Sequence, residues 1–292
     1  MAVATGDLAT WVVGAERRLR ESDMDQGQNP FRWRGTVTDP AAFIGRDLEM
    51  QAIFTRLKTL SCVSVVGARR IGKSSLLYQA SLRAQQVLGP NCRAVFLDLL
   101  SAKYHSLDGL LGSLLQGFAG PDLALPGATA TEKLAAFEDA VRTARSKGIM
   151  PVAFLDEFES IASRSDEFGD NALESWRSLG NDGQIAFVIS SAQPLDRLTQ
   201  QSGLTSSFYN IFAQTKLGEF SEKEARAFGL YALRAGAFEM SDETFLLRVG
   251  GRHPLKLQVA AWHLYEARRS GQVDFGVLQQ RAQEEVSAMM KA

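Results

Sequence analysis

The chain has 292 residues with a formal net charge of −1, and 45% of its residues are hydrophobic. This length is enough for one α/β domain and a smaller second one, and the near-neutral charge argues against a broad basic surface for nucleic acid or an anionic membrane. Two dispersed cysteines, no signal-peptide pattern and no apolar run near 18 residues exclude a disulfide framework and a membrane span, so we expect a cytoplasmic protein.

The first part of the chain, residues 1–40, predicts a helix followed by an extended lead-in. Apolar residues recur on one helical face over residues 7–21, and a polar linker follows over 22–30. Residues 33–40 are predicted to be extended. A second amphipathic helix is expected over 47–59.

The most informative motif follows the apolar strand predicted over 63–66. The segment from Gly67 to Ser74 fits the phosphate-loop template G-x-x-x-x-G-K-[ST], and a helix is expected over 74–88. Gly67 and Gly72 allow the backbone N–H groups to turn toward an anion, which the start of the helix also attracts. Lys73 can bridge the β- and γ-phosphates, and the Ser74 hydroxyl can bind Mg²⁺. The predicted nucleotide-binding residues of this loop are Gly67, Ala68, Arg69, Arg70, Ile71, Gly72, Lys73, Ser74 and Ser75.

An acidic strand supplies the second element of a nucleotide site. After a strand over 94–99 and helices over 107–118 and 131–147, four apolar residues precede Asp156 and Glu157. Ligands of parallel α/β sheets bind at the carboxyl ends of the strands, where these carboxylates lie. We expect Asp156 to hold Mg²⁺ and Glu157 to activate water as the general base, whereas Glu159 is expected to face away.

The remaining core elements complete a parallel α/β sheet. A helix is expected over 171–179, with strands over 185–189 and 215–217. Strands that alternate with helices predict a parallel sheet covered on both faces. Insertion of strand 185–189 between the phosphate-loop strand and the acidic strand gives the order 5-1-4-3-2, which is typical of hydrolytic P-loop NTPases. The core is therefore predicted over residues 41–219.

The pattern changes to helices alone over residues 220–292. Ser221 and Ser241 are predicted helix caps, and Pro254 is expected to open a third helix that ends near residue 269. A fourth helix is predicted over 274–291. We expect these helices to form a lid that follows the nucleotide-binding core.

Three segments together resemble a known family. They are Asn29-Pro30-Phe31, the run from Phe43 to Glu49, and Arg69-Arg70-Ile71 inside the phosphate loop. They look like bacterial AAA-like ATPases of AAA+ layout, close to the STAND and archaeal-type ATPases, with origin-recognition ATPases as more distant relatives. The resemblance covers roughly residues 29–266, and it implies ATP or ADP and Mg²⁺ as ligands. It also implies adenine contacts from Phe43, Ile44, Gly45 and Arg46, a segment that composition alone would describe as a turn before a helix.

The same resemblance assigns sensor positions. The run from Gly250 to Leu255 resembles the lid motif, which implies that Pro254 touches the base and that Arg252 reaches the γ-phosphate. Arg252 stands where a glycine is common, and the alternative is a solvent-exposed arginine. The polar residues after strand 185–189, namely Ser190, Ser191 and Gln193, are candidates for the sensor-1 position, where the family favours Asn or Thr. No arginine finger is assigned among Arg164, Arg177 and Arg197.

Two classes of function fit this pattern. In the first, ATP binding and hydrolysis drive a switch that closes the two domains and acts on a protein partner or on a second copy of the chain. In the second, the nucleotide is a structural ligand of an adaptor with little turnover. A DNA-loading ATPase ranks last because the basic winged-helix domain of that group is not seen, and the abrupt C-terminus leaves open that an effector portion is missing. Membrane insertion is not expected, and nucleic acid is a disfavoured partner that the sequence does not exclude.

Overall fold

The computed structural model describes residues 29–121, 124–236 and 238–291, and the helix predicted over 7–21 lies outside them. The chain divides into two compact units. We refer to Arg46–Phe220 as the core unit. The second unit combines residues that precede and follow the core unit in sequence, and we refer to it as the helical unit. Its described residues are 29–45, 221–236 and 238–291.

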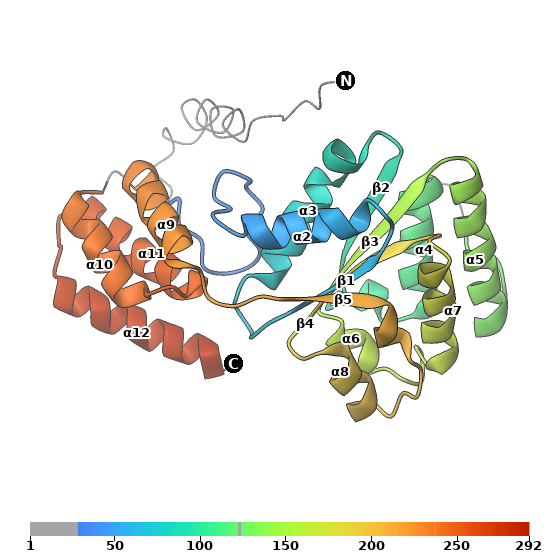
Figure 1. Cartoon of the computed structure of the whole chain (residues 1–292). Helices are drawn as coiled ribbons and strands as arrows, with labels where there is room; N and C mark the ends of the chain where they lie inside the picture. The colour runs from blue at the N-terminus through green and yellow to red at the C-terminus, as the bar shows by residue number, and fades with distance from the viewer. Residues whose placement is uncertain (1–28, 122–123, 237, 292) are drawn as a thin grey trace, which may run out of the picture. The chain divides into compact units, whose positions relative to one another are not determined.

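The core unit is built on one parallel sheet (Figure 1). Its described strands lie in the order β2-β3-β4-β1-β5, so β4 is inserted between β1 and β3, as the sequence predicted. The strands are β1 (Cys62–Val66), β2 (Cys92–Asp98), β3 (Met150–Asp156), β4 (Ala186–Ser191) and β5 (Phe212–Lys216). Because β1, β3 and β4 are buried along nearly their whole length, their apolar runs form the centre of the fold.

Helices cover both faces of this sheet (Figure 1). One face carries α2 (Asp47–Leu57) and α3 (Lys73–Leu88), which contact each other and the strands. The other face carries α4 (Leu107–Ala119), α5 (Ala130–Ser146) and α7 (Asp170–Asn181). The short elements of the core unit are η1 (Ala102–Tyr104), α6 (Glu159–Ala162), α8 (Leu195–Gln201) and η2 (Phe208–Ile211). Trp176 of α7 packs on Phe168, Phe187 and Phe208 in the larger apolar cluster.

The strand register aligns the carboxyl ends of the central strands. Asp98 pairs with Asp156, Leu155 pairs with Ile189, and Val65 pairs with Ser190. The phosphate loop follows β1 at this same end. The parallel arrangement therefore gathers the motif residues at one edge of the sheet.

The helical unit contains α9 (Glu222–Ala235), α10 (Met240–Gly250), α11 (Pro254–Ser270) and α12 (Phe275–Lys291). Ser221 caps α9 in a capping box with Glu224, and Pro254 is the first residue of α11, as predicted. The prediction that Ser241 caps α10 was wrong. Glu239 occupies the cap position because it and Asp242 bond reciprocally to each other's backbone N–H groups.

Residues 29–45 pack within the helical unit. The Asn29 side chain donates to the Trp262 carbonyl at 3.0 Å and to the Glu266 carboxylate at 2.9 Å. Phe31 is 1% exposed and its ring packs on four aromatic side chains of this unit, namely Phe228, Tyr231, Phe238 and Tyr265. Phe31 is therefore part of the apolar core of the helices, whereas none of residues 33–40 is buried.

Candidate nucleotide site

At the start of the phosphate loop, the backbone of Gly67 lies close to the backbone of Leu217. A Cβ atom at Gly67 would lie 2.5 Å from the Leu217 carbonyl oxygen, so a larger residue does not fit there. The Gly67 N–H donates to the Ser191 carbonyl at 3.2 Å, and Leu217 N–H donates to the Val66 carbonyl at 2.7 Å. Further along the loop, Gly72 has φ +101°, a conformation that glycine adopts without strain. These contacts hold the loop between the ends of β4 and β5.

Lys73 places a positive charge within the loop. It is the first residue of α3 and is only 4% exposed. Its ammonium group donates to the carbonyls of Gly67 at 3.0 Å and Ala68 at 3.2 Å. A bound phosphate offers stronger, charged acceptors for these same donors. The loop and the start of α3 thus combine an ammonium group with helix N–H groups suited to an anion.

Asp156 lies at the end of β3 and is 3% exposed. Ser190 of the neighbouring β4 donates its hydroxyl to the Asp156 carboxylate, and Ser74 of the phosphate loop also bonds to it. Burial raises the pKa of the Asp156 carboxyl above its ordinary value, while the hydrogen bonds from Ser190 and Ser74 partly offset this rise. The structure therefore brings the predicted metal-binding pair Ser74 and Asp156 together.

Glu157 adopts a strained backbone conformation. Its φ of +56° lies in the left-handed region, which is uncommon for a residue with a side chain. Its N–H donates to the Ser190 hydroxyl at 3.0 Å, and Phe158 N–H donates to the Ser190 carbonyl at 3.0 Å. Such strain persists where surrounding contacts enforce it, and it is frequent at functional sites.

The charge environment of Glu157 suits a proton acceptor. Burial raises the pKa of its carboxyl, and the nearby Glu159 and Asp156 carboxylates raise it further. Lys73 and Arg69 oppose this shift. A carboxylate whose pKa is raised above its ordinary value is a stronger base, once deprotonated, than an ordinary surface glutamate.

Ser190 stands out among the three sensor-1 candidates. Its hydroxyl contacts both carboxylate-bearing residues, as donor to Asp156 and as acceptor from Glu157 N–H. The Ser191 hydroxyl instead donates to the Gln193 carbonyl at 2.6 Å. Both serines are fully buried. The structure therefore brings Ser190, and not the hydroxyl of Ser191, to the acidic end of β3.

Glu159 also has a contact that the sequence did not reveal. Its carboxylate accepts a hydrogen bond from the Ala192 N–H, in the loop that follows β4. The sequence left two roles open for Glu159, a structural one and support of the site from outside the ligand contacts, and this contact favours the second. Its carboxylate helps to hold the sensor-1 loop and adds to the negative charge beside Glu157.

The residues with predicted base and γ-phosphate contacts lie in different units. Phe43, Ile44 and Gly45 belong to the helical unit, as do Arg252 and Pro254, whereas Arg46 belongs to the core unit. Arg252 is exposed just before α11. The adenine contacts of the first group and the sensor role of Arg252 stay predictions.

Among the arginines considered as a finger, Arg164 is held inside its own unit. Its guanidinium donates to the Ser160 hydroxyl at 2.8 Å and lies 3.2 Å from the His105 ring nitrogen Nδ1. These contacts join α6 to the segment after β2. Arg164 is therefore engaged in the core rather than presented to a neighbouring molecule.

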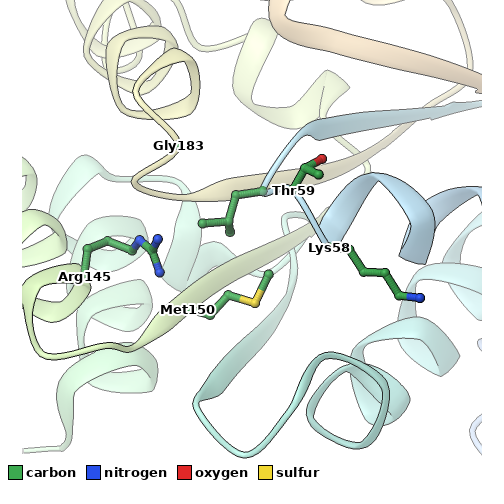
Figure 2. A pocket seen from close by; sticks show the side chains of 6 residues that line it. Lys58, Thr59, Arg145, Met150 and Gly183 are labelled. Atoms are coloured by element: carbon green, nitrogen blue, oxygen red, sulfur yellow. The ribbon is translucent and has the colours of Figure 1, made fainter. Parts of the chain in front are cut away.

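A cavity of about 380 Å³ lies at the other end of the sheet (Figure 2). It is lined by Lys58, Thr59, Leu60, Arg145, Met150 and Gly183. Leu60, Met150 and Gly183 stand at or before the starts of their strands, away from the phosphate loop. In Figure 2 the Lys58 side chain points away from the Arg145 guanidinium, so the two cations do not converge on one anion.

The oxygen donors at the phosphate loop fit Mg²⁺. Among the described residues, no group of three or more His, Cys, Asp or Glu side chains could hold a metal ion by itself. Mg²⁺ does not require such a cage, because it usually binds one or two protein oxygens together with phosphates and water. The Ser74 hydroxyl and the Asp156 carboxylate, which bond to each other, supply that kind of incomplete set.

Comparison with known proteins identifies the fold of this core. Residues 56–199 match the AAA domain family. The core unit therefore has the fold of an AAA-like P-loop ATPase domain. No curated protein sequence matches the chain. Within the described residues, none of the helices has the length and apolar character that a membrane crossing requires.

Solved structures share this architecture at low sequence identity. A Walker-type ATPase of Pyrococcus abyssi is 16% identical with a TM-score of 0.65, over 88% of this chain and 76% of that one. The ORC2 protein of Aeropyrum pernix, in ADPNP–ADP complexes, is 15% identical with a TM-score of 0.63, over 87% and 71%. Domain III of the Thermotoga maritima replication initiation protein DnaA is 15% identical with a TM-score of 0.56, over 83% and 96%. At these identities the likeness concerns the AAA+ fold.

Proposed function

We propose that this chain is a Mg²⁺-dependent ATPase that works as a molecular switch. The observation that supports it most is the Ser190 hydroxyl, which joins Asp156 to the backbone of Glu157 at the end of β3. A domain that merely binds nucleotide has no need of a half-buried, strained glutamate beside the aspartate proposed to bind the metal. This arrangement favours hydrolysis over the adaptor alternative.

In the proposed reaction, the phosphate loop and Lys73 bind the phosphates of ATP. Ser74 and Asp156 would hold Mg²⁺, which would neutralise charge on the phosphate oxygens. Glu157 accepts a proton from the attacking water while the bond from the γ-phosphorus to the β–γ bridging oxygen breaks. The water oxygen forms the new bond to the γ-phosphorus, so the products are ADP, inorganic phosphate and the proton held by Glu157.

We expect slow turnover by the isolated chain. An arginine finger supplies about 10³–10⁵ in rate in related phosphoryl-transfer enzymes, and no arginine of this chain is assigned that role. We therefore propose that a partner protein or a second copy of the chain completes the site. Assembly in the presence of a non-hydrolysable ATP analogue, measured by light scattering, tests this part of the proposal.

Lys73→Ala tests the proposed site. Loss of a charge-assisted phosphate contact should weaken ATP and ADP binding by about 1.5–3 kcal/mol or more, measured by titration calorimetry. Lys58→Ala is the matched control, because Lys58 is exposed in the same unit and stands at the cavity on the other end of the sheet. Wild-type affinity in Lys73→Ala, or equal losses in both variants, would contradict the phosphate-loop assignment.

A further inference from the structure

The chain passes between its two units at two places. One crossing lies between Gly45 and Arg46, and the other lies between Phe220 and Ser221. In the core unit, the residues next to the two crossings are in contact through the Arg46 side chain. The Arg46 guanidinium donates to the Gly218 carbonyl at 2.7 Å and lies 4.7 Å from the centre of the Phe220 ring.

The same guanidinium reaches the phosphate loop. Its Nη2 also donates to the Ile71 carbonyl at 3.0 Å, and Nη1 donates to Glu49 at 3.2 Å. Ile71 stands between Arg70, with φ +62°, and Gly72, with φ +101°. Arg46 therefore holds the loop at the point where its backbone turns toward the phosphate position.

The properties of Arg46 favour a role beyond packing. It is 3% exposed, and burial of a charged group is unfavourable unless each hydrogen bond is made. Its own φ of +69° is uncommon for a residue with a side chain. Only the planar, forked guanidinium can serve two carbonyls, a carboxylate and an aromatic face together.

On the side of the helical unit, the two crossings are also neighbours. A Cβ atom at Gly45 would lie 2.9 Å from the Glu224 carboxylate. That carboxylate accepts from the Ser221 N–H at 2.7 Å, where α9 begins. Within each unit, therefore, the residues next to the two crossings are held together.

We propose that Arg46 is a positioning residue that links the phosphate loop to both connections between the units. This inference rests on the proposed nucleotide-binding function. Nucleotide on the loop fixes the Ile71 carbonyl, and Arg46 passes that restraint to the Gly218–Phe220 segment and to the backbone at Gly45. In this role Arg46 supports the backbone of the phosphate loop through the Ile71 carbonyl. The role is additional to the base contact predicted for the segment from Phe43 to Arg46.

The test compares Arg46→Met, which keeps the approximate volume, with Arg46→Lys, which keeps the charge but loses the fork. Arg56→Met is the matched control, because Arg56 is exposed on α2 in the same unit. ADP affinity is measured by calorimetry, and amide exchange is measured with and without ADP. In the wild-type chain and in Arg56→Met, ADP should slow exchange in the phosphate loop, in residues 43–49 and in residues 217–224.

In both Arg46 variants, ADP affinity should fall about tenfold, as expected for a lost hydrogen bond to a charged group. Protection of the phosphate loop by bound ADP should persist, and protection at the two connections should disappear. A purely structural role would lower thermal stability without separating these two regions. Retained protection at the connections in Arg46→Met would overturn the proposal.

Two further measurements, on Glu49→Gln and on nucleotide binding by the wild-type chain, test the proposal if Arg46→Met does not fold or if no nucleotide binds. If Arg46→Met does not fold, Glu49→Gln removes the ion pair but leaves both carbonyl contacts, and it should keep the protection at the connections that Arg46→Lys loses. Equal behaviour of Glu49→Gln and Arg46→Lys would overturn the role of the two carbonyl bonds. A wild-type chain that binds neither ADP nor an ATP analogue would instead refute the proposed function itself.

Discussion

In the core unit, the Asp156 carboxylate is buried and bonded to Ser190, whereas in the helical unit the candidate Arg252 is exposed at the start of a helix. The groups proposed for metal binding and proton transfer are thus held in place by contacts between neighbouring strands. Preorganised groups of this kind stabilise a transition state without reorganisation. Among the hydrogen bonds of the described residues, the helical unit has no comparable network at Arg252. An arginine without such a network can change its position when nucleotide binds.

The largest expected effect tests the preorganised part of this comparison. Glu157→Gln keeps the shape of the side chain and removes the proton acceptor, so ATP binding should persist while turnover falls by about 10²–10⁴. Phosphate release and nucleotide affinity are measured on the same preparation. Glu159→Gln is the comparison variant, because it changes a neighbouring carboxylate, which bonds to the Ala192 N–H, without removing the proposed base. Near-wild-type turnover in Glu157→Gln would transfer the role to Glu159.

The pH dependence follows from the same residue. A general base acts only when it is deprotonated, so turnover should rise with pH through the pKa of Glu157. Burial and the carboxylates of Glu159 and Asp156 hold that pKa above the ordinary glutamate value. Glu159→Gln should therefore shift the acidic limb of the turnover profile to lower pH. A profile that does not move in this variant would contradict the electrostatic link between the two glutamates.

The next effect concerns the packing of Phe31 in the helical unit. Phe31→Ala removes a buried ring that packs among four aromatic side chains, which should destabilise this unit by about 3–5 kcal/mol. Calorimetric unfolding should show the loss, with Phe31→Leu as the milder control. Nucleotide affinity of the core should change less than stability. Equal stability of Phe31→Ala and wild type would contradict the packing of residues 29–45 on these helices.

The two units also differ in how far the sequence predicts them. The phosphate loop and the acidic strand are local motifs that directly follow apolar runs in the sequence. Both motifs were therefore recognised, and the strand order was predicted correctly. The packing of Phe31 was not found, because partners such as Phe228 and Tyr265 are far away in the sequence and nothing nearby marks the contact. The cap of α10 was misplaced, because Glu239 and Asp242 form reciprocal bonds that prevail over Ser241.

Ser190 shows the same limit within the site. The sequence placed three polar residues after the predicted strand 185–189 but did not distinguish them, because the choice depends on the register between β3 and β4. In the structure Leu155 pairs with Ile189, so the next residues, Asp156 and Ser190, become neighbours. Long-range register is decided by packing of the whole sheet, which a local pattern does not contain.

A smaller effect follows from this contact. Ser190→Ala removes the donor to Asp156 and the acceptor for Glu157 N–H, which should reduce turnover about tenfold and raise the Mg²⁺ concentration required. Mg²⁺ titration of phosphate release at saturating ATP measures both. Ser191→Ala is a matched control, because it is equally buried and its hydroxyl bonds to the Gln193 carbonyl. Equal effects of the two substitutions would show that the Ser190 contacts play no special part.

The smallest expected effect concerns Arg252 of the helical unit. A ligand at a hundredfold excess over its Kd stabilises the bound form by about 2.7 kcal/mol, so saturating nucleotide should raise the melting temperature. If Arg252 reaches the γ-phosphate, Arg252→Ala should reduce the rise caused by a non-hydrolysable ATP analogue and leave the rise caused by ADP nearly unchanged. Since only the analogue carries a γ-phosphate, the difference between the two nucleotides is the informative quantity. Arg269→Ala, an exposed arginine at the end of α11, is the control for loss of charge in the same unit. Equal losses with both nucleotides would make Arg252 a residue of the helical surface, and the two units would then differ because only the core takes part in nucleotide binding.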